Sequence, residues 1–217
     1  MPRKLYALLL VCIMTATAAA AQAERSYFGA RLGMNVTFPT GSENTYGTGA
    51  GFHAGVIYHR ALRNHIFVEP GLFYSQASMS NRHPFEYDNF MFNGTATTYS
   101  LRIPVYVGYT FHPSENFALD LSTGPALNIN LAARQGFDPN FDAPMPIPSK
   151  KRIDMLQHGW NRADGLWGIK LSMNFSDSYY LGISGEVSFT PLARYGNGDK
   201  KIKIHRNSVA VTFGYNF

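Results

Sequence analysis

Residues 99–111 read YSLRIPVYVGYTF, and aliphatic or aromatic side chains occupy every odd-numbered position of this stretch. The even-numbered positions carry Ser, Arg, Pro, Tyr, Gly and Thr. Successive side chains of a β-strand point to opposite faces. The alternation therefore predicts a strand with one strongly apolar face and one face of mainly small or polar residues.

The same period-two pattern recurs along the chain and predicts an all-β protein. We expect eight strands, at about residues 26–38, 49–59, 65–76, 97–111, 117–131, 164–175, 179–192 and 207–217. The links between them alternate in length. Short links fall at 60–64, 112–116 and 176–178, and long links at 39–48, 77–96, 132–163 and 193–206. This regular alternation is typical of outer-membrane barrels, whose short turns face the periplasm and whose long loops face outward.

The character of the two strand faces indicates which one faces the interior. A soluble eight-stranded barrel fills its interior with large apolar side chains. Here the polar face is built mostly from Gly, Ser, Thr and Asn, which suits a narrow bore, and the aliphatic face carries Tyr and Phe near the strand ends. Charged residues are only 15% of the chain, against about 25% in a typical soluble domain. We predict an eight-stranded antiparallel up-and-down transmembrane β-barrel, with a soluble sandwich or lipocalin-like barrel as the alternative.

A membrane barrel must close on itself, because unpaired backbone groups are not tolerated in lipid. The last strand is therefore expected to pair with the first.

The N-terminal segment has the features of a secretory signal peptide. Arg3 and Lys4 precede an apolar run at residues 5–14, and Ala-Gln-Ala at 21–23 forms a small-residue cleavage site. The run is shorter than the ~20 residues of a spanning helix, which disfavours an N-terminal anchor. We expect residues 1–23 to be removed, leaving 24–217 as a barrel domain in the bacterial outer membrane. The sole cysteine, Cys12, lies within the predicted leader, so no disulfide or thiolate metal site is expected in the mature chain.

Seven ionisable residues fall on the faces predicted to point into the bore: Arg31, His53, Glu69, Arg102, Asp120, Lys170 and Glu186. Buried charges need partners, since an unpaired one carries a large desolvation penalty. We expect Glu69 or Asp120 to pair with Arg102, and Lys170 to pair with Glu186, because these residues lie on neighbouring strands. A polar network that holds the barrel closed is the leading interpretation, and a path for protons or small solutes is an alternative.

A hydrolytic site is the third interpretation of the bore. Nucleophilic catalysis needs a base beside a hydroxyl and an acid that orients the base. His53 could combine with Ser184 and Glu186, or with Ser122 and Asp120. The remaining histidines lack metal-ligand spacing, so neither a metal nor a cofactor is expected.

The long loops carry two candidate interaction surfaces. The last loop is basic and is predicted to face lipopolysaccharide phosphates, through Arg194, Lys200, Lys201, Lys203 and Arg206. The second loop is aromatic and suggests a protein partner, through Phe85, Tyr87, Phe90 and Phe92. A solvated basic loop and a self-packed aromatic loop are the alternatives. The net charge of +5 does not indicate nucleic-acid binding, because the basic residues do not line one element and the chain is predicted to be exported.

Three short motifs resemble one known family. LRIPV at 101–105 followed by GYTF at 108–111, FGARLGMN at 28–35 and GPA at 124–126 resemble strands of the outer-membrane β-barrel domain common in Bacteroidetes, which includes PorT-like proteins. The resemblance covers nearly all of the predicted mature chain and implies the fold and the outer-membrane location. PorT itself is associated with type IX secretion, although no residue motif specific to that role is present.

The expected function is that of a non-enzymatic outer-membrane barrel, either structural or an accessory subunit of an envelope or secretion complex. The alternatives are an outer-membrane enzyme acting on lipid or peptide, and a narrow channel. A general porin is disfavoured, because side chains fill a barrel of eight strands.

Overall fold

The computed structural model describes residues 26–41, 46–80, 85–87, 90–114, 116–139, 152–157, 159–176, 178–195 and 202–217. The predicted signal peptide, Lys200 and Lys201 lie outside these residues. The long strands are β1 (Tyr27–Gly41), β2 (Gly49–Ala61), β3 (Ile66–Ser80), β5 (Phe90–Ser114), β6 (Phe117–Pro139), β8 (Ala163–Phe175), β9 (Tyr179–Ser188) and β11 (Ile202–Asn216). The short elements are β4 (Phe85–Tyr87), β7 (Arg152–Asp154), the 3₁₀ turn η1 (Met155–Gln157) and β10 (Ala193–Tyr195). Within the part of the chain described, no helix has the length and apolar character needed to cross a membrane.

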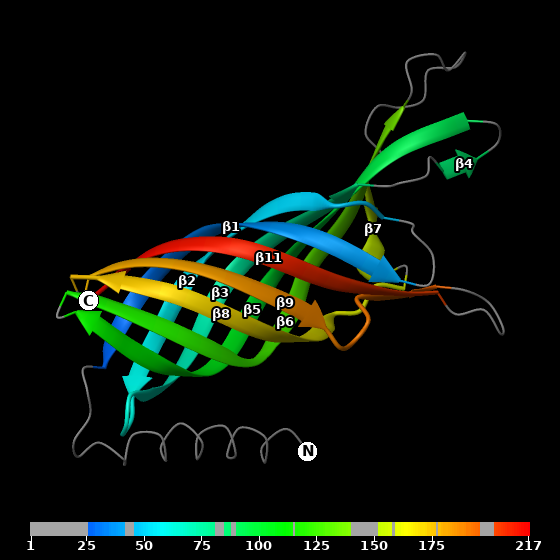
Figure 1. The fold of residues 1–217 in the computed structure, drawn as a ribbon. Coiled ribbons are helices and arrows are strands. Elements are labelled where there is room, and N and C mark those ends of the chain that lie inside the picture. The colour runs from blue at the N-terminus through cyan, green and yellow to red at the C-terminus, as the bar shows by residue number, and fades with distance from the viewer. Residues whose placement is uncertain are drawn as a thin grey trace.

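The eight long strands form a closed antiparallel barrel (Figure 1). The spatial order is β5-β3-β2-β1-β11-β9-β8-β6, and pairing of β5 with β6 closes the ring. The last strand pairs with the first along β1, from Gly29 opposite Asn216 to Gly41 opposite Ile204. The predicted eight-stranded up-and-down barrel is confirmed, and all of its backbone edges are joined.

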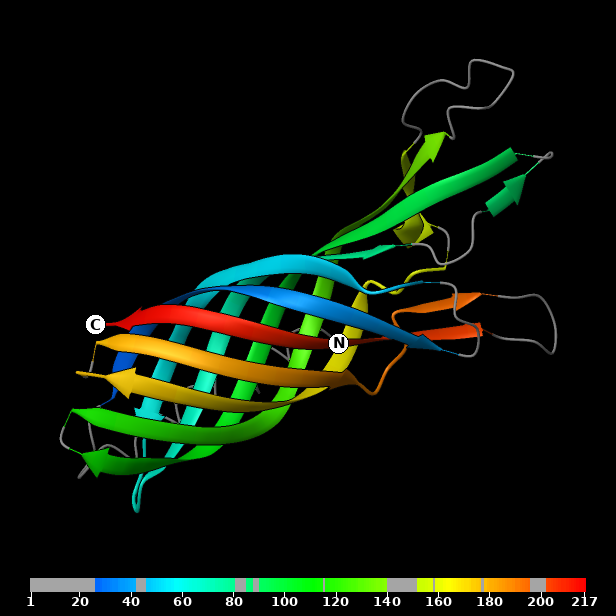
Figure 2. The ribbon, with the colours of Figure 1, turned by 45° about the horizontal axis from the view of Figure 1, so that its top comes forward.

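Several strands end at positions other than those predicted. β5 and β6 continue beyond residues 97 and 131, and their ladder extends to Phe92 opposite Pro139. The alternation of inward and outward side chains in β6 is interrupted at Leu131, because Tyr99 pairs with Ala132 whereas Ser100 pairs with Asn130. Leu131 is therefore a bulge residue, which breaks the sequence pattern while the ladder continues. Figure 2 shows the two strands rising past the rim of the barrel.

The outer wall is an apolar belt bordered by aromatic residues. On β1, Phe28 is 63% exposed and Phe38 is 40% exposed. The ten steps between them, at ~3.3 Å each and a tilt of ~40°, span about 25 Å along the barrel axis, which is the height of the apolar band in membrane barrels. Exposed aromatics near the short turns are Phe28, Phe111, Phe175, Tyr179, Tyr215 and Phe217, and those toward the long loops are Phe38, Phe52, Tyr74, Trp167 and Phe189.

The interior consists of a polar bore beneath an apolar cap. The cap lies at the long-loop end and is built from strand ends and loop residues: Tyr46, Met79, Ala96, Ala133, Met155, Trp160, Leu192, Ala193 and Ile204. Met79, Ala96, Ala133, Leu192 and Ala193 have no exposed surface. The cap is therefore a buried apolar cluster at the long-loop end of the barrel.

Candidate functional site: the polar bore

The structure places all seven of the predicted inward residues on the inner wall. The exposed fractions are 4% for Arg31, 3% for His53, 4% for Glu69, 2% for Asp120, 7% for Lys170 and 6% for Glu186. The side chain of Arg102 is 12% exposed. They face inward because each occupies an alternate position of a regular strand.

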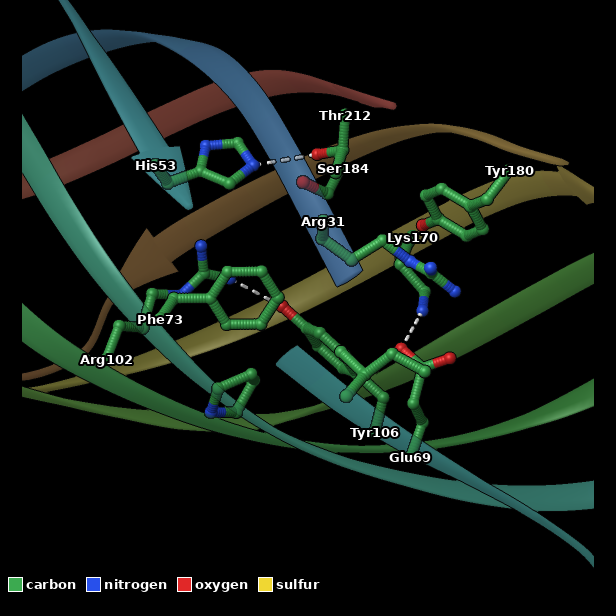
Figure 3. A pocket seen from close by; sticks show the side chains of 12 residues that line it. Arg31, His53, Glu69, Phe73, Arg102, Tyr106, Lys170, Tyr180, Ser184 and Thr212 are labelled. Carbon is green, nitrogen blue, oxygen red and sulfur yellow. Dashed lines mark hydrogen bonds and ion pairs between the residues drawn. The ribbon is translucent and has the colours of Figure 1, made fainter. Parts of the chain in front are cut away.

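Two ion pairs cross the bore, and Figure 3 shows one of them, between Lys170 and Glu69. Lys170 Nζ donates a hydrogen bond to Glu69 Oε1 at 2.5 Å. Arg102 forms an ion pair with Glu186. The Tyr106 hydroxyl joins this second pair, since it accepts a hydrogen bond from Arg102 at 2.9 Å and donates one to Glu186 Oε1 at 2.7 Å.

The pairings predicted from neighbouring strands are wrong. Glu69 on β3 reaches Lys170 on β8, and Arg102 on β5 reaches Glu186 on β9. In a narrow bore, long side chains meet across the barrel axis, whereas the cross-strand rule describes only adjacent positions on one sheet face. The stagger of the strands decides which side chains lie at the same height along the barrel axis, and sequence alone does not give this stagger.

A second polar layer lies nearer the short turns. Asp120 accepts hydrogen bonds from Thr110 Oγ1 and from Asn174 Nδ2, each at 2.7 Å. Asn174 in turn accepts a hydrogen bond from Asn216 Nδ2 at 3.1 Å, and Asn216 accepts one from Arg31 at 2.7 Å. Two asparagines therefore connect the carboxylate of Asp120 to the guanidinium of Arg31.

A third layer lies beneath the apolar cap and was not predicted. Arg206 donates from its NH2 group to both carboxylate oxygens of Asp164, at 3.0 and 2.9 Å, and from its NH1 group to Thr98 Oγ1 at 3.1 Å. Asn130 Nδ2 also donates to Asp164, at 3.0 Å. Arg206 is only 5% exposed.

The assignment of Arg206 to a lipopolysaccharide-facing loop is therefore wrong. β11 begins at Ile202 rather than at residue 207, so Arg206 continues the inward series of Ala210 and Thr212. Its even-numbered position, in phase with that series, was the signal that could have identified it. Asp164 was not predicted, because it is the first residue of the strand expected at 164–175 and no earlier residue of that strand defines its face.

The other predicted loop residues are placed only in part. Lys203 is exposed on β11, and its backbone pairs with that of Arg194 on β10. The aromatic residues of the second loop fall on two paired segments, because Phe85 and Tyr87 of β4 lie opposite Phe92 and Phe90 of β5.

The structure does not assemble the predicted hydrolytic trio. His53 Nε2 hydrogen-bonds with Thr212 Oγ1 at 2.8 Å. Glu186 is bound to Arg102 and Tyr106. Ser184 borders the same cavity as His53 (Figure 3), but the arrangement provides no hydroxyl–imidazole–carboxylate chain. Among the residues described, no group of three or more His, Cys, Asp or Glu side chains could hold a metal ion.

The cavity at the centre of the bore is small. The cavity bordered by Arg31, His53, Glu69, Arg102 and Lys170 has a volume of about 30 Å³. A cavity of this size holds a water molecule or two, whereas small-molecule sites enclose ~300–1,000 Å³. The arrangement ties strands together by charge and hydrogen bonding.

A closed eight-stranded barrel with an outward apolar belt, aromatic borders and a filled polar bore is the architecture of an outer-membrane protein. The family model for the outer membrane protein beta-barrel domain matches residues 20–194. The chain belongs to this family, and it is a protein of the bacterial outer membrane.

Several solved barrels are similar in structure. Ail of Yersinia pestis, in complex with the heparin analogue sucrose octasulfate, is 13% identical with a TM-score of 0.47, over 89% of this chain and 100% of that chain. OprG of Pseudomonas aeruginosa is 12% identical with a TM-score of 0.47, over 90% of this chain and 97% of that chain. Neisserial surface protein A is 10% identical with a TM-score of 0.45, over 89% of this chain and 100% of that chain. No curated protein sequence matches the chain.

Proposed function

We propose that this barrel is a non-enzymatic outer-membrane protein that serves as a structural or accessory subunit of an envelope complex. The observation that carries the proposal is the filled bore. Ion pairs occupy it at two levels, a relay of asparagines occupies a third, and an apolar cap covers it. The small volume of the central cavity, about 30 Å³, supports a structural role over a solute path or a substrate site.

The extension of β5 and β6 is the surface through which an accessory role would operate. The last pair between β3 and β5 is Ser80 with Thr95, and above it β5 continues to pair with β6 up to Phe92. β4 adds to the β5 side of this extension, and β7 pairs with β6 at residues 134–136. A protruding sheet of this kind offers a firm platform for a partner, because its backbone is already ordered by the ladder.

The resemblance to PorT-like proteins favours a secretion complex as the finer version of the proposal. Lipopolysaccharide is the second proposed partner, through Arg194, Lys200, Lys201 and Lys203 at the last long loop, since ammonium and guanidinium groups bind phosphate well. Removal of residues 1–23 before Glu24 is part of the same proposal, and N-terminal sequencing of protein from isolated outer membranes tests it.

Chemical crosslinking in intact outer membranes tests the accessory role. The variant replaces residues 81–94 by a tight turn between Ser80 and Thr95, which form a ladder pair of β3 and β5, and so removes β4 and the protruding part of β5. Its matched control shortens the loop between β1 and β2 instead, so that both variants keep all eight strands. We expect wild type and control to capture the same envelope protein, and the variant without the extension to lose it while still folding. A homogeneous uncrosslinked monomer in the wild type, the variant and the control would contradict the accessory role. In a separate measurement, steady conductance of the wild type in planar bilayers would favour a channel.

A further inference from the structure

Two histidines meet at the short-turn end of the barrel, outside the bore. His65 lies in the turn between β2 and β3, and His112 lies near the end of β5. Their ring centroids are 5.5 Å apart, and both residues are exposed. Their spacing in the sequence does not reveal the pair, because it is the antiparallel register of β3 with β5, with Ile66 opposite Tyr109, that brings the two histidines together.

The distance between the two rings suits a shared metal ion. Imidazole nitrogens bind Zn²⁺ at ~2.0–2.1 Å, so two imidazoles that share one ion at a tetrahedral angle place their ring centroids about 5 Å apart. The rings of His65 and His112 are inclined to each other by 53°, and exposed side chains change rotamer rapidly. The backbone therefore sets the spacing, and rotation of the two side chains aims one nitrogen of each ring at the ion.

The backbone of the turn is an independent observation that singles out His65. Asn64 and His65 have φ values of 59° and 62°, and the backbone N–H of Ile66 donates to Arg63 O at 3.4 Å. Positive φ at both central residues is the pattern of a type I′ turn, whose preferred central pair is Asn-Gly. Histidine thus occupies a position that glycine would take without strain. A strained residue of this kind points to a function of its side chain.

The surroundings of the pair are open to water. Tyr109 lies beside His65, with ring centroids 5.7 Å apart, and so restricts that imidazole on one side. Arg63 of the same turn is exposed, and its long side chain can hold its charge in solvent, away from a bound cation. The short turns of outer-membrane barrels face the periplasm, so an ion reaches the two histidines from that compartment.

We propose that His65 and His112 bind one divalent transition-metal ion at the periplasmic end of the barrel, with water at the remaining coordination positions. Imidazole suits Cu²⁺, Ni²⁺ and Zn²⁺, and affinity is greatest for Cu²⁺. Structural zinc sites use four protein ligands, so a site with two protein ligands and water keeps its ion exchangeable. The proposal uses no residue of the bore or of the basic loop, and it does not depend on an accessory role in an envelope complex.

Isothermal titration calorimetry tests the proposal, with CuCl₂ and ZnCl₂ as probes and untagged mature protein folded in detergent. His65→Gly removes one ligand and places in the turn the residue that its backbone favours. His112→Gln removes the other ligand. His205→Gln is the matched control, because His205 is a partly exposed histidine that lies on β11 opposite Thr40, at the long-loop end. The heat-dependent gel mobility of each variant confirms that it is folded.

We expect wild type and His205→Gln to bind one Cu²⁺ equally well and to bind Zn²⁺ more weakly. Loss of an outer-shell partner alone weakens metal binding ~10–100-fold, so His65→Gly and His112→Gln should each weaken Cu²⁺ binding at least tenfold. The double variant should lose little more than either single variant, because both ligands serve one ion. Unchanged Cu²⁺ affinity in His65→Gly or in His112→Gln would overturn the site. Two bound ions in the wild type, with one lost in each single variant, would also overturn it, because the histidines would then act separately.

Discussion

At the scale of single residues, the barrel depends on charges that are buried in complementary sets. Asp164 has no exposed side-chain surface, and the guanidinium of Arg206 contacts both of its oxygens. Breaking a buried pair by removing one partner leaves an uncompensated charge, whereas replacing both by apolar groups often costs little.

Arg206→Ala is therefore expected to lower the free energy of unfolding by about 3–5 kcal/mol. The double variant Arg206→Met with Asp164→Leu should recover most of that loss. Urea unfolding in lipid vesicles, followed by tryptophan fluorescence, measures the unfolding free energy of the single and the double variant. Arg134→Ala serves as the control, because Arg134 is exposed. If Arg206→Ala unfolds at the same urea concentration as Arg134→Ala, the buried pair does not stabilise the barrel.

The hydroxyl of Tyr106 stands between Arg102 and Glu186 and hydrogen-bonds with both. Tyr106→Phe removes these bonds without changing the ring. We expect a loss of about 1.5–3 kcal/mol, the value of a hydrogen bond to a charged group. Tyr109→Phe is the matched control, since Tyr109 is 40% exposed on the outer wall. Equal thermal stability of the two variants would argue against a role for the hydroxyl in the bore.

At the scale of elements, period-two alternation was sufficient to predict the eight strands and their order, because each strand has one face toward lipid. It did not predict where β5 and β6 end, since the bulge at Leu131 reverses the pattern without ending the ladder. Nor did it predict the pairs across the bore. Lys170 meets Glu69 rather than Glu186, and such contacts depend on strand stagger and side-chain reach.

The short turns also depend on local backbone conformation. Ser176 has a φ of 48°, a left-handed conformation that costs L-residues about 1–2 kcal/mol and costs glycine almost nothing. Ser176→Gly should therefore keep or raise the unfolding free energy. Ser176→Val should lower it by about 1–2 kcal/mol. Ser114→Val is the control at another short turn, because Ser114 is the last residue of strand β5 and has an extended backbone. Denaturant titration compares the three, and equal loss in both valine variants would contradict the backbone explanation.

At the scale of the whole molecule, the proposed structural role implies that the polar bore and the apolar cap together leave no open path. We expect the wild-type protein to show no steady conductance in planar bilayers. Arg102→Ala combined with Glu186→Ala should leave the current unchanged, because the cap still covers the bore. A current in the double variant alone would mean that the central pair, rather than the cap, is the seal.

The central claim is that the aliphatic face of every strand contacts lipid and the compact polar face fills the bore. Spin labels can test it position by position, because the sole native cysteine is Cys12, within the predicted leader. Single cysteines at Val36, Leu127, Ile183 and Val211 sample exposed positions on four different strands. In bilayers, all four labels should collide with oxygen and not with a water-soluble nickel chelate. Nickel accessibility at these positions, or a mature chain that is compact and monodisperse in water without detergent or lipid, would contradict the account.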